Sequence, residues 1–162
     1  MYKITTSLCL AMCVQMTAAQ AEQSQGALLK TSKMSIGAGV ARNDVDGPGY
    51  DDSEIGFQFF AAYDLDQVNL IEGTKSSVEL GYMDYGFSRG DAGGLWTTYV
   101  LDGAIRDNLR WLARLGLDLG DDSGLMLGAG AGIRLNSATQ IRIEYVIRDD
   151  IDSLQFNFIY HL

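Results

Sequence analysis

The chain has 162 residues, with 12 lysines and arginines against 21 aspartates and glutamates, and its formal net charge is −9 at pH 7. This acidic balance argues against nucleic acid and anionic lipid head groups as general partners, because both repel negative charge. The only two cysteines, Cys9 and Cys13, lie near the amino terminus. The length fits one domain, and no disulfide framework is expected to stabilise it.

The first residues predict a secretory signal peptide over residues 1–21. Lys3 provides a positive start, a short apolar stretch follows, and Ala19-Gln20-Ala21 forms a small-x-small cleavage site. A membrane-spanning helix is disfavoured, because the apolar stretch is shorter than the ~20 residues that a bilayer requires. Lipid attachment at Cys13 stays an alternative, since residues 10–13 loosely resemble a lipoprotein box. Cleavage would leave a mature chain that begins at Glu22 and has no thiol.

Residues 22–33 show no periodicity and are predicted to form an unstructured leader. Residues 34–162 instead consist of short segments in which apolar side chains alternate with small or polar ones. This period of two is typical of strands and not of helices, and segments rich in Gly, Asp, Asn and Ser separate the strands. The predicted strands cover residues 34–42, 55–64, 77–87, 95–106, 109–119, 124–135, 141–148 and 154–162.

Residues 108–119, NLRWLARLGLDL, have a second interpretation as an amphipathic helix with its arginines on one side. The alternation of Leu115, Leu117 and Leu119 favours a strand, and the glycine at 116 disfavours a helix. Eight strands joined by short connections predict an all-β fold, an eight-stranded antiparallel up-and-down transmembrane β-barrel. Eight is the smallest common strand number for a closed barrel, and side chains fill its interior.

Alternation alone does not say which face of the barrel is inside. A soluble periplasmic lipocalin-like barrel would enclose the leucines around a hydrophobic ligand, whereas a transmembrane barrel turns them to lipid. Glycines on the polar face favour the transmembrane barrel, because they make room in a narrow lumen for long side chains. Tyr63, Trp111 and Tyr160 fall near strand ends on the apolar face, where aromatic rings suit a membrane interface. The strands also match the ~9 to 11 residues of a tilted transmembrane strand.

Charged residues on the polar face are the candidate site residues. Enclosed arginines need counter-ions, because breaking a buried pair costs ~3 to 5 kcal/mol. Around Arg134, Arg142 and Glu144, a satisfied ionic core that keeps the barrel closed is favoured over a gate or plug in a pore. The predicted lumen charges are Glu79, Asp102, Arg106, Arg110, Arg114, Asp118, Arg134, Arg142, Glu144 and Arg148.

No catalytic, cofactor or metal motif stands out, so we expect no enzyme and no cofactor. His161 is the only histidine, and no serine lies two residues from it. Lipid A deacylase barrels resemble this chain in architecture but carry such a pair on one strand. The acids of residues 44–54 could hold calcium, yet their spacing does not fit an EF-hand, and solvated loop charge is favoured. A lipid-modifying enzyme stays an alternative.

The carboxy-terminal sequence resembles a known family. Residues 125–162, LMLGAGAGIRLNSATQIRIEYVIRDDIDSLQFNFIYHL, are similar to the end of the small eight-stranded outer-membrane barrels of Gram-negative bacteria, the outer-membrane protein A transmembrane-domain type. VELGYMDYG, residues 78–86, is similar to the third strand of that family. Proteins of the family usually have an aromatic residue at the carboxy terminus, where this sequence has Leu162.

The resemblance implies a location in the cell outer membrane. It further implies that the chain is a monomer whose partners are outer-membrane lipid and, during insertion, the barrel-assembly machinery. A structural, adhesive or envelope-integrity role is expected, with acidic loops facing outward.

Overall fold

The computed structural model describes residues 29–45, 53–68, 70–87 and 93–162. The chain divides into two units, residues 1–31 and 32–162, and the second unit contains the described strands. The predicted signal peptide and most of the predicted leader lie outside the described residues. The last three leader residues form a short 3-10 helix, η1 (Thr31–Lys33). No helix among the described residues is long and apolar enough to cross a membrane.

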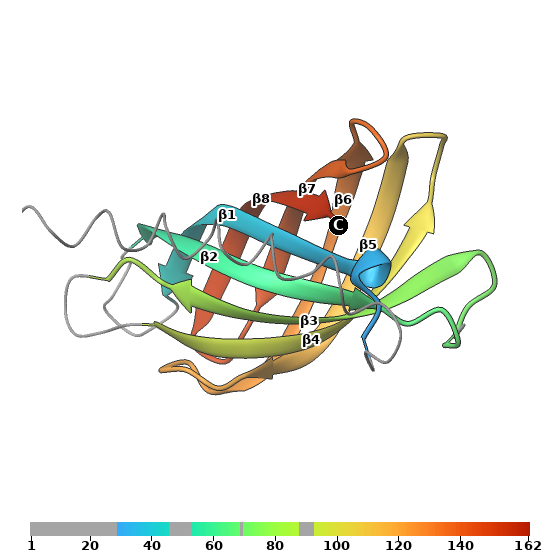
Figure 1. Ribbon diagram of the computed structural model, residues 1–162. Coiled ribbons are helices and arrows are strands. Elements are labelled where there is room, and N and C mark those ends of the chain that lie inside the picture. Colours follow the sequence, from blue (N-terminus) through green and yellow to red (C-terminus); the bar gives the residue numbers. More distant parts are fainter. Residues whose placement is uncertain (1–28, 46–52, 69, 88–92) are drawn as a thin grey trace, which may run out of the picture. The chain divides into compact units, whose positions relative to one another are not determined.

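The strands close into one antiparallel barrel, in which each strand pairs with its neighbours in sequence and β1 pairs with β8 (Figure 1). Closure leaves no strand edge exposed. This confirms the predicted all-β eight-stranded barrel. The strands are β1 (Met34–Val45), β2 (Ser53–Asp64), β3 (Thr74–Asp84), β4 (Gly93–Ala104), β5 (Leu109–Asp118), β6 (Gly124–Arg134), β7 (Thr139–Ile147) and β8 (Ile151–His161).

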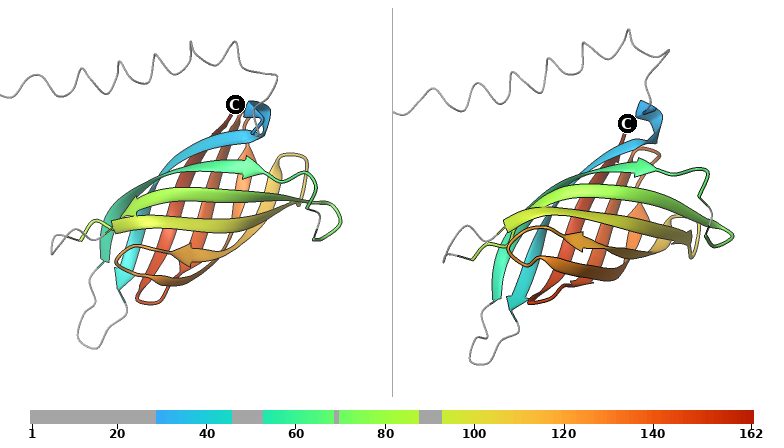
Figure 2. Two further views of the ribbon diagram at one scale, coloured as in Figure 1. Left: turned by 60° about the horizontal axis from the view of Figure 1, so that its bottom comes forward. Right: turned by 90° about the horizontal axis from the view of Figure 1, so that it is seen from below.

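The barrel has two different ends, which Figure 2 shows from two sides. At the turn end lie the start of β1, the end of β8 and the connections β2–β3, β4–β5 and β6–β7. At the loop end, β1 and β3 end and β2 and β4 begin, and the connections β5–β6 and β7–β8 lie there. Residues 108–119, for which the sequence also allowed an amphipathic helix, contain β5. The leucines of this strand alternate with residues that face the lumen.

Several strand boundaries differ from the prediction by two or three residues, and the ends of β3 and β4 have a clear local cause. β3 ends at Asp84 instead of residue 87, because Gly86 takes a left-handed conformation, with φ of 84°. Its backbone N–H binds the Asp84 carboxylate at 2.8 Å. β4 ends at Ala104, because the backbone N–H groups of Ile105 and Arg106 both turn back to the carbonyl of Leu109.

The outer face of the barrel is apolar. Large hydrophobic side chains on this face, such as Leu127 and Phe158, are 47% and 48% exposed. A soluble monomer rarely exposes an apolar surface of this extent, whereas the lipid-facing band of a membrane barrel requires it. The lipocalin-like alternative is therefore wrong, because the leucines face outward and the polar set is enclosed.

Glycines on the inner face make room for bulky side chains on neighbouring strands. A Cβ added at Gly37 would lie 2.2 Å from the ring of Phe60, and one at Gly81 would lie 2.4 Å from the ring of Trp96. Gly128 makes room for an arginine, since its added Cβ would lie 2.9 Å from Cγ of Arg114. The sequence predicted that these glycines make room for long side chains such as arginine. In the structure they make room for aromatic rings as well.

Candidate functional site in the barrel lumen

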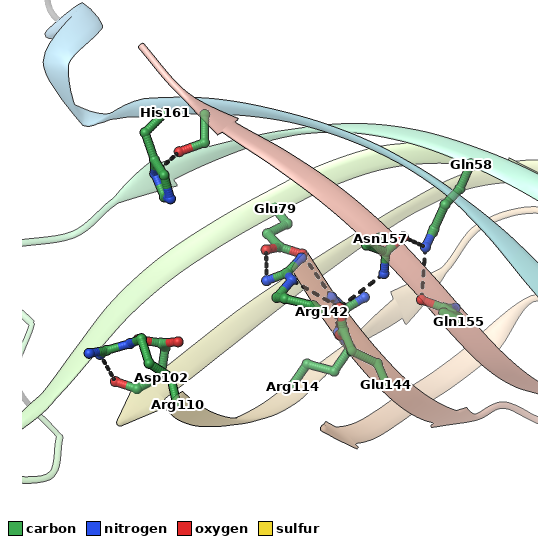
Figure 3. A network of polar contacts seen from close by, with 11 residues as sticks. Gln58, Glu79, Asp102, Arg110, Arg114, Arg142, Glu144, Gln155, Asn157 and His161 are labelled. Carbon is green, nitrogen blue, oxygen red and sulfur yellow. Dashed lines mark hydrogen bonds and ion pairs between the residues drawn. The ribbon is translucent and has the colours of Figure 1, made fainter. Parts of the chain in front are cut away.

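Four charged side chains meet at the centre of the lumen, and we call them the central quartet: Glu79, Arg114, Arg142 and Glu144 (Figure 3). They come from β3, β5 and β7, which are not neighbours in the sheet. Their side chains are between 0% and 6% exposed. The period-two pattern of each strand directs these residues inward, and barrel closure then brings the strands face to face.

Glu79 is the best-bound member of the quartet. One of its carboxylate oxygens accepts a hydrogen bond from Arg114 at 2.9 Å, and the other accepts one from Arg142 at 2.8 Å. Glu144 makes ionic contacts with the same arginines, at 2.6 Å to Arg114 and 3.0 Å to Arg142. Each carboxylate therefore bridges two guanidinium groups, so the buried charges balance within the quartet.

Aromatic rings and amides surround the quartet. The guanidinium carbon of Arg142 lies 5.3 Å from the ring centroid of Phe60, and that of Arg114 lies 5.5 Å from the ring of Trp96. These distances fit cation–π contacts. On the other side, the Asn157 amide donates to Glu144 at 3.0 Å.

An amide layer continues from Asn157. The side-chain amide of Gln58 donates to the carbonyl oxygens of Gln155 and Asn157, at 2.8 Å and 2.7 Å. Figure 3 labels these three residues, and all three are buried. They therefore extend the packed polar interior from β2 to β8.

Towards the loop end, Asp118 is the centre of a second polar cluster. Its carboxylate accepts hydrogen bonds from the Tyr85 hydroxyl at 2.5 Å and from Arg148 at 2.9 Å. Arg148 also donates to the hydroxyl of Ser153 at 2.7 Å, which in turn donates to Asn43 at 2.5 Å. Burial, and then the bond to Asp118, raise the pKa of Tyr85 above its usual range, so the phenol stays neutral.

Asp122 ties two loops together at the same end. Its carboxylate accepts the backbone N–H groups of Asp150 and Ile151, each at 2.9 Å. Burial raises the pKa of this carboxyl, although the two backbone hydrogen bonds act in the opposite direction. The β5–β6 connection is thereby fixed to the start of β8.

At the turn end, the polar contacts are fewer. Asp102 forms an ion pair with Arg110, and both side chains are only partly buried. Across the β1–β8 seam, the Ser35 hydroxyl lies 2.7 Å from Nδ1 of His161. The Nε atom of Arg134 is buried and has no hydrogen-bond partner among the described residues.

The ten predicted lumen charges are distributed unevenly. Six are buried, in the quartet or around Asp118; three lie at the turn end and are partly buried; Arg106 is exposed. Arg106 was predicted as a lumen charge, but β4 ends before this residue, which belongs to the β4–β5 turn. The buried residues are Glu79, Arg114, Asp118, Arg142, Glu144 and Arg148, and the partly buried ones are Asp102, Arg110 and Arg134.

The sequence-based set missed the neutral partners of these charges. The alternation along the chain also directs three neutral side chains inward, those of Tyr85, Gln58 and Asn157. This alternation was the signal that could have identified them. The Ser35–His161 pair had no such signal, because it forms only when the first strand meets the last. The acids of residues 46–52 lie outside the described part of the chain. Among the described residues, no three His, Cys, Asp or Glu side chains gather closely enough to hold a metal ion.

Comparison with protein-family models and with curated proteins gives no match. Solved structures do resemble the chain. A de novo designed transmembrane β-barrel aligns with a TM-score of 0.58 and 15% identity, covering 82% of this chain and 98% of the other. Ail, the attachment invasion locus protein of Yersinia pestis, aligns with a TM-score of 0.53 and 17% identity, covering 78% and 94%.

The outer-membrane enzyme PagL aligns with a TM-score of 0.54 and 13% identity, covering 79% of this chain and 99% of the other. An attachment protein and an enzyme therefore share this architecture, so the fold does not by itself select a role. What the likeness establishes, together with the apolar outer face, is the fold: this chain is a small eight-stranded transmembrane β-barrel.

Proposed function

We propose that this protein is a non-conducting barrel of the Gram-negative outer membrane, of the outer-membrane protein A transmembrane-domain type, with a structural, adhesive or envelope-integrity role. The central quartet is the observation that carries the proposal. Four charged side chains with at most 6% exposure cross the lumen at one level. A pore needs a continuous water path, and this layer, closed by reciprocal ion pairs, interrupts it.

The loop end supports a role outside the membrane surface. In this proposal it faces the exterior, and the turn end faces the periplasm. Acidic residues predominate in its described part: Asp44, Glu54, Asp84, Asp121, Asp122, Asp149, Asp150 and Asp152. An acidic rim favours cationic partners and repels anionic ones, with an effect that salt screens. The attachment function named for Ail shows that such a scaffold can serve adhesion.

Insertion and conductance test the proposal together. The purified chain, refolded in detergent, is expected to migrate faster on an unboiled gel than after boiling, as a closed membrane barrel does. Once it is reconstituted into planar bilayers, no stable conductance steps are expected. A chain that fractionates with the soluble periplasm would contradict the location, and steady single-channel currents would contradict the closed lumen.

A lipid-modifying enzyme is the competing candidate, and the Ser35–His161 contact is the observation in its favour. A hydroxyl 2.7 Å from an imidazole nitrogen is within the reach of a nucleophile and its base. The pair faces the lumen, however, and Ser35 is only 3% exposed, whereas acyl chains contact the outer face. We therefore expect no lipid hydrolysis by the purified barrel, and activity that Ser35→Ala abolishes would reverse this assignment.

A further inference from the structure

A polar cavity of about 210 Å³ lies in the lumen at the turn end, and we call it the vestibule. Its floor is formed by Glu79 and Arg142 of the central quartet, and its mouth includes Ser137 of the β6–β7 turn. The volume is several times the ~30 Å³ that one water occupies in the liquid. The vestibule therefore has room for a small ligand that enters from the turn end.

Most charges on the vestibule wall already have a partner. Glu79 binds Arg142 at 2.8 Å, and Asp102 forms its ion pair with Arg110. Asp64, on β2, lies within electrostatic range of Lys75 and of His161. The acidic side chains that face the cavity from β2, β3 and β4 are thus each opposed by a cation.

On the opposite wall, formed by β6, β7 and β8, polar groups lack acceptors. The Nε atom of Arg134, the amide nitrogen of Gln140 and Nε2 of His161 are buried and have no hydrogen-bond partner among the described residues. Gln140 is only 5% exposed, and its amide packs against Gly132, where an added Cβ would lie 2.4 Å from the nitrogen. A buried donor without an acceptor is destabilising, so an acceptor from outside the chain would be stabilising.

From this asymmetry we propose that the vestibule binds a small oxyanion, such as a phosphate or a carboxylate group, with Arg134 as its main ligand. The planar guanidinium presents paired donors that match such oxygens. The amide of Gln140 supplies a further donor from β7. His161 adds a third donor in the tautomer whose Nδ1 accepts the Ser35 hydroxyl, because the ring proton is then at Nε2.

Titration calorimetry of the full, refolded chain in neutral detergent, with inorganic phosphate and with acetate at constant ionic strength, tests this site. We expect one bound oxyanion per barrel. In Arg134→Gln the affinity should fall at least about tenfold, which corresponds to the loss of a charge-assisted hydrogen bond. Tighter binding of phosphate would show that the site prefers a tetrahedral oxyanion, and tighter binding of acetate that it prefers a planar carboxylate. Either result supports the site.

Arg106→Gln is the matched control, because Arg106 is an exposed arginine at the same end of the barrel. Its affinity should equal that of the unmodified chain. The faster migration of each unboiled variant on a gel verifies that it has folded. The site is refuted if neither anion binds, or if the Arg106 and Arg134 variants weaken binding equally, since that result describes general charge attraction.

Discussion

The two halves of the lumen are built from the same kinds of residue but differ in how their charged groups are paired. From the central quartet to the loop end, carboxylates and arginines are buried and bind one another, directly or through Tyr85, Ser153 and the amides. At the turn end, the vestibule keeps Arg134 without a counter-ion and leaves space beside it. The first half closes the barrel, and the second is accessible from one end.

The difference shows that a charge in a barrel lumen can have either of two roles. A buried ion pair contributes little net stability over an apolar core, but removing one partner leaves an uncompensated charge and is costly. Arg134 instead lines a cavity and has no hydrogen-bond partner at Nε among the described residues, so its removal leaves no buried partner unpaired. Substitutions in the two halves should therefore have very different effects on stability.

The largest effect is expected for Glu144→Ala. This change leaves one carboxylate for two buried guanidinium groups and should lower the free energy of unfolding by ~3 to 5 kcal/mol. Urea unfolding in detergent, followed by the gel shift or by circular dichroism, measures it. Glu72→Ala, an exposed acid in the β2–β3 turn, is the control and should change little. An unchanged midpoint in Glu144→Ala would argue against buried pairing.

Tyr85→Phe should have the next largest effect. It removes the hydrogen bond to the Asp118 carboxylate, which is worth ~1.5 to 3 kcal/mol for a bond to a charged group. Unfolding midpoints at pH 8 measure the loss. Tyr82→Phe, on the exposed outer face, serves as the control.

The same residue predicts a pH dependence. Burial raises the pKa of Tyr85, so its stabilising contribution is complete below the unfolded value, about 10, and is lost as the pH rises above it. Between about pH 10 and 11 the unmodified chain should lose up to ~1.4 kcal/mol more stability than Tyr85→Phe. Equal slopes for the two proteins would show that Tyr85 ionises as readily in the barrel as in the unfolded chain.

A smaller effect is expected for Gly81→Ala. The added Cβ would lie 2.4 Å from the ring of Trp96, so the ring must shift. Overpacking of this kind costs ~1 to 3 kcal/mol. In a Trp111→Phe background, a change in the fluorescence of Trp96 reports the shift. Gly124→Ala is the control, since its added Cβ meets only ordinary contacts, the nearest at 3.4 Å.

The smallest effect is expected for Arg134→Gln. Because the Nε atom of Arg134 has no hydrogen-bond partner among the described residues, its removal leaves no buried partner unpaired. The change in stability should therefore stay within ~0.5 kcal/mol in the absence of added anions. Arg142→Gln, eight residues further on and inside the quartet, should instead cost ~3 to 5 kcal/mol. Similar losses for the two arginines would remove the distinction between the two halves of the lumen.

The sequence by itself determined the strands and the two faces of the barrel. Alternation is a local property, so the pattern around Leu127 and Phe158 was enough to separate an apolar face from a polar one. The excess of glycine and arginine on the polar face then indicated which side is enclosed. Glu79, Arg114 and Arg142 were all predicted as lumen charges for this reason.

Only the tertiary structure decided which of those charges meet. Glu79 lies on β3 and its arginines on β5 and β7, so their contact depends on how the closed sheet curves and staggers its strands, which no local pattern encodes. The same applies to Ser35 and His161, which closure brings together from opposite ends of the barrel sequence. The alternation in the sequence continues to Arg106 and predicts that this side chain faces the lumen. The chain turns two residues earlier, so Arg106 lies in the β4–β5 turn instead.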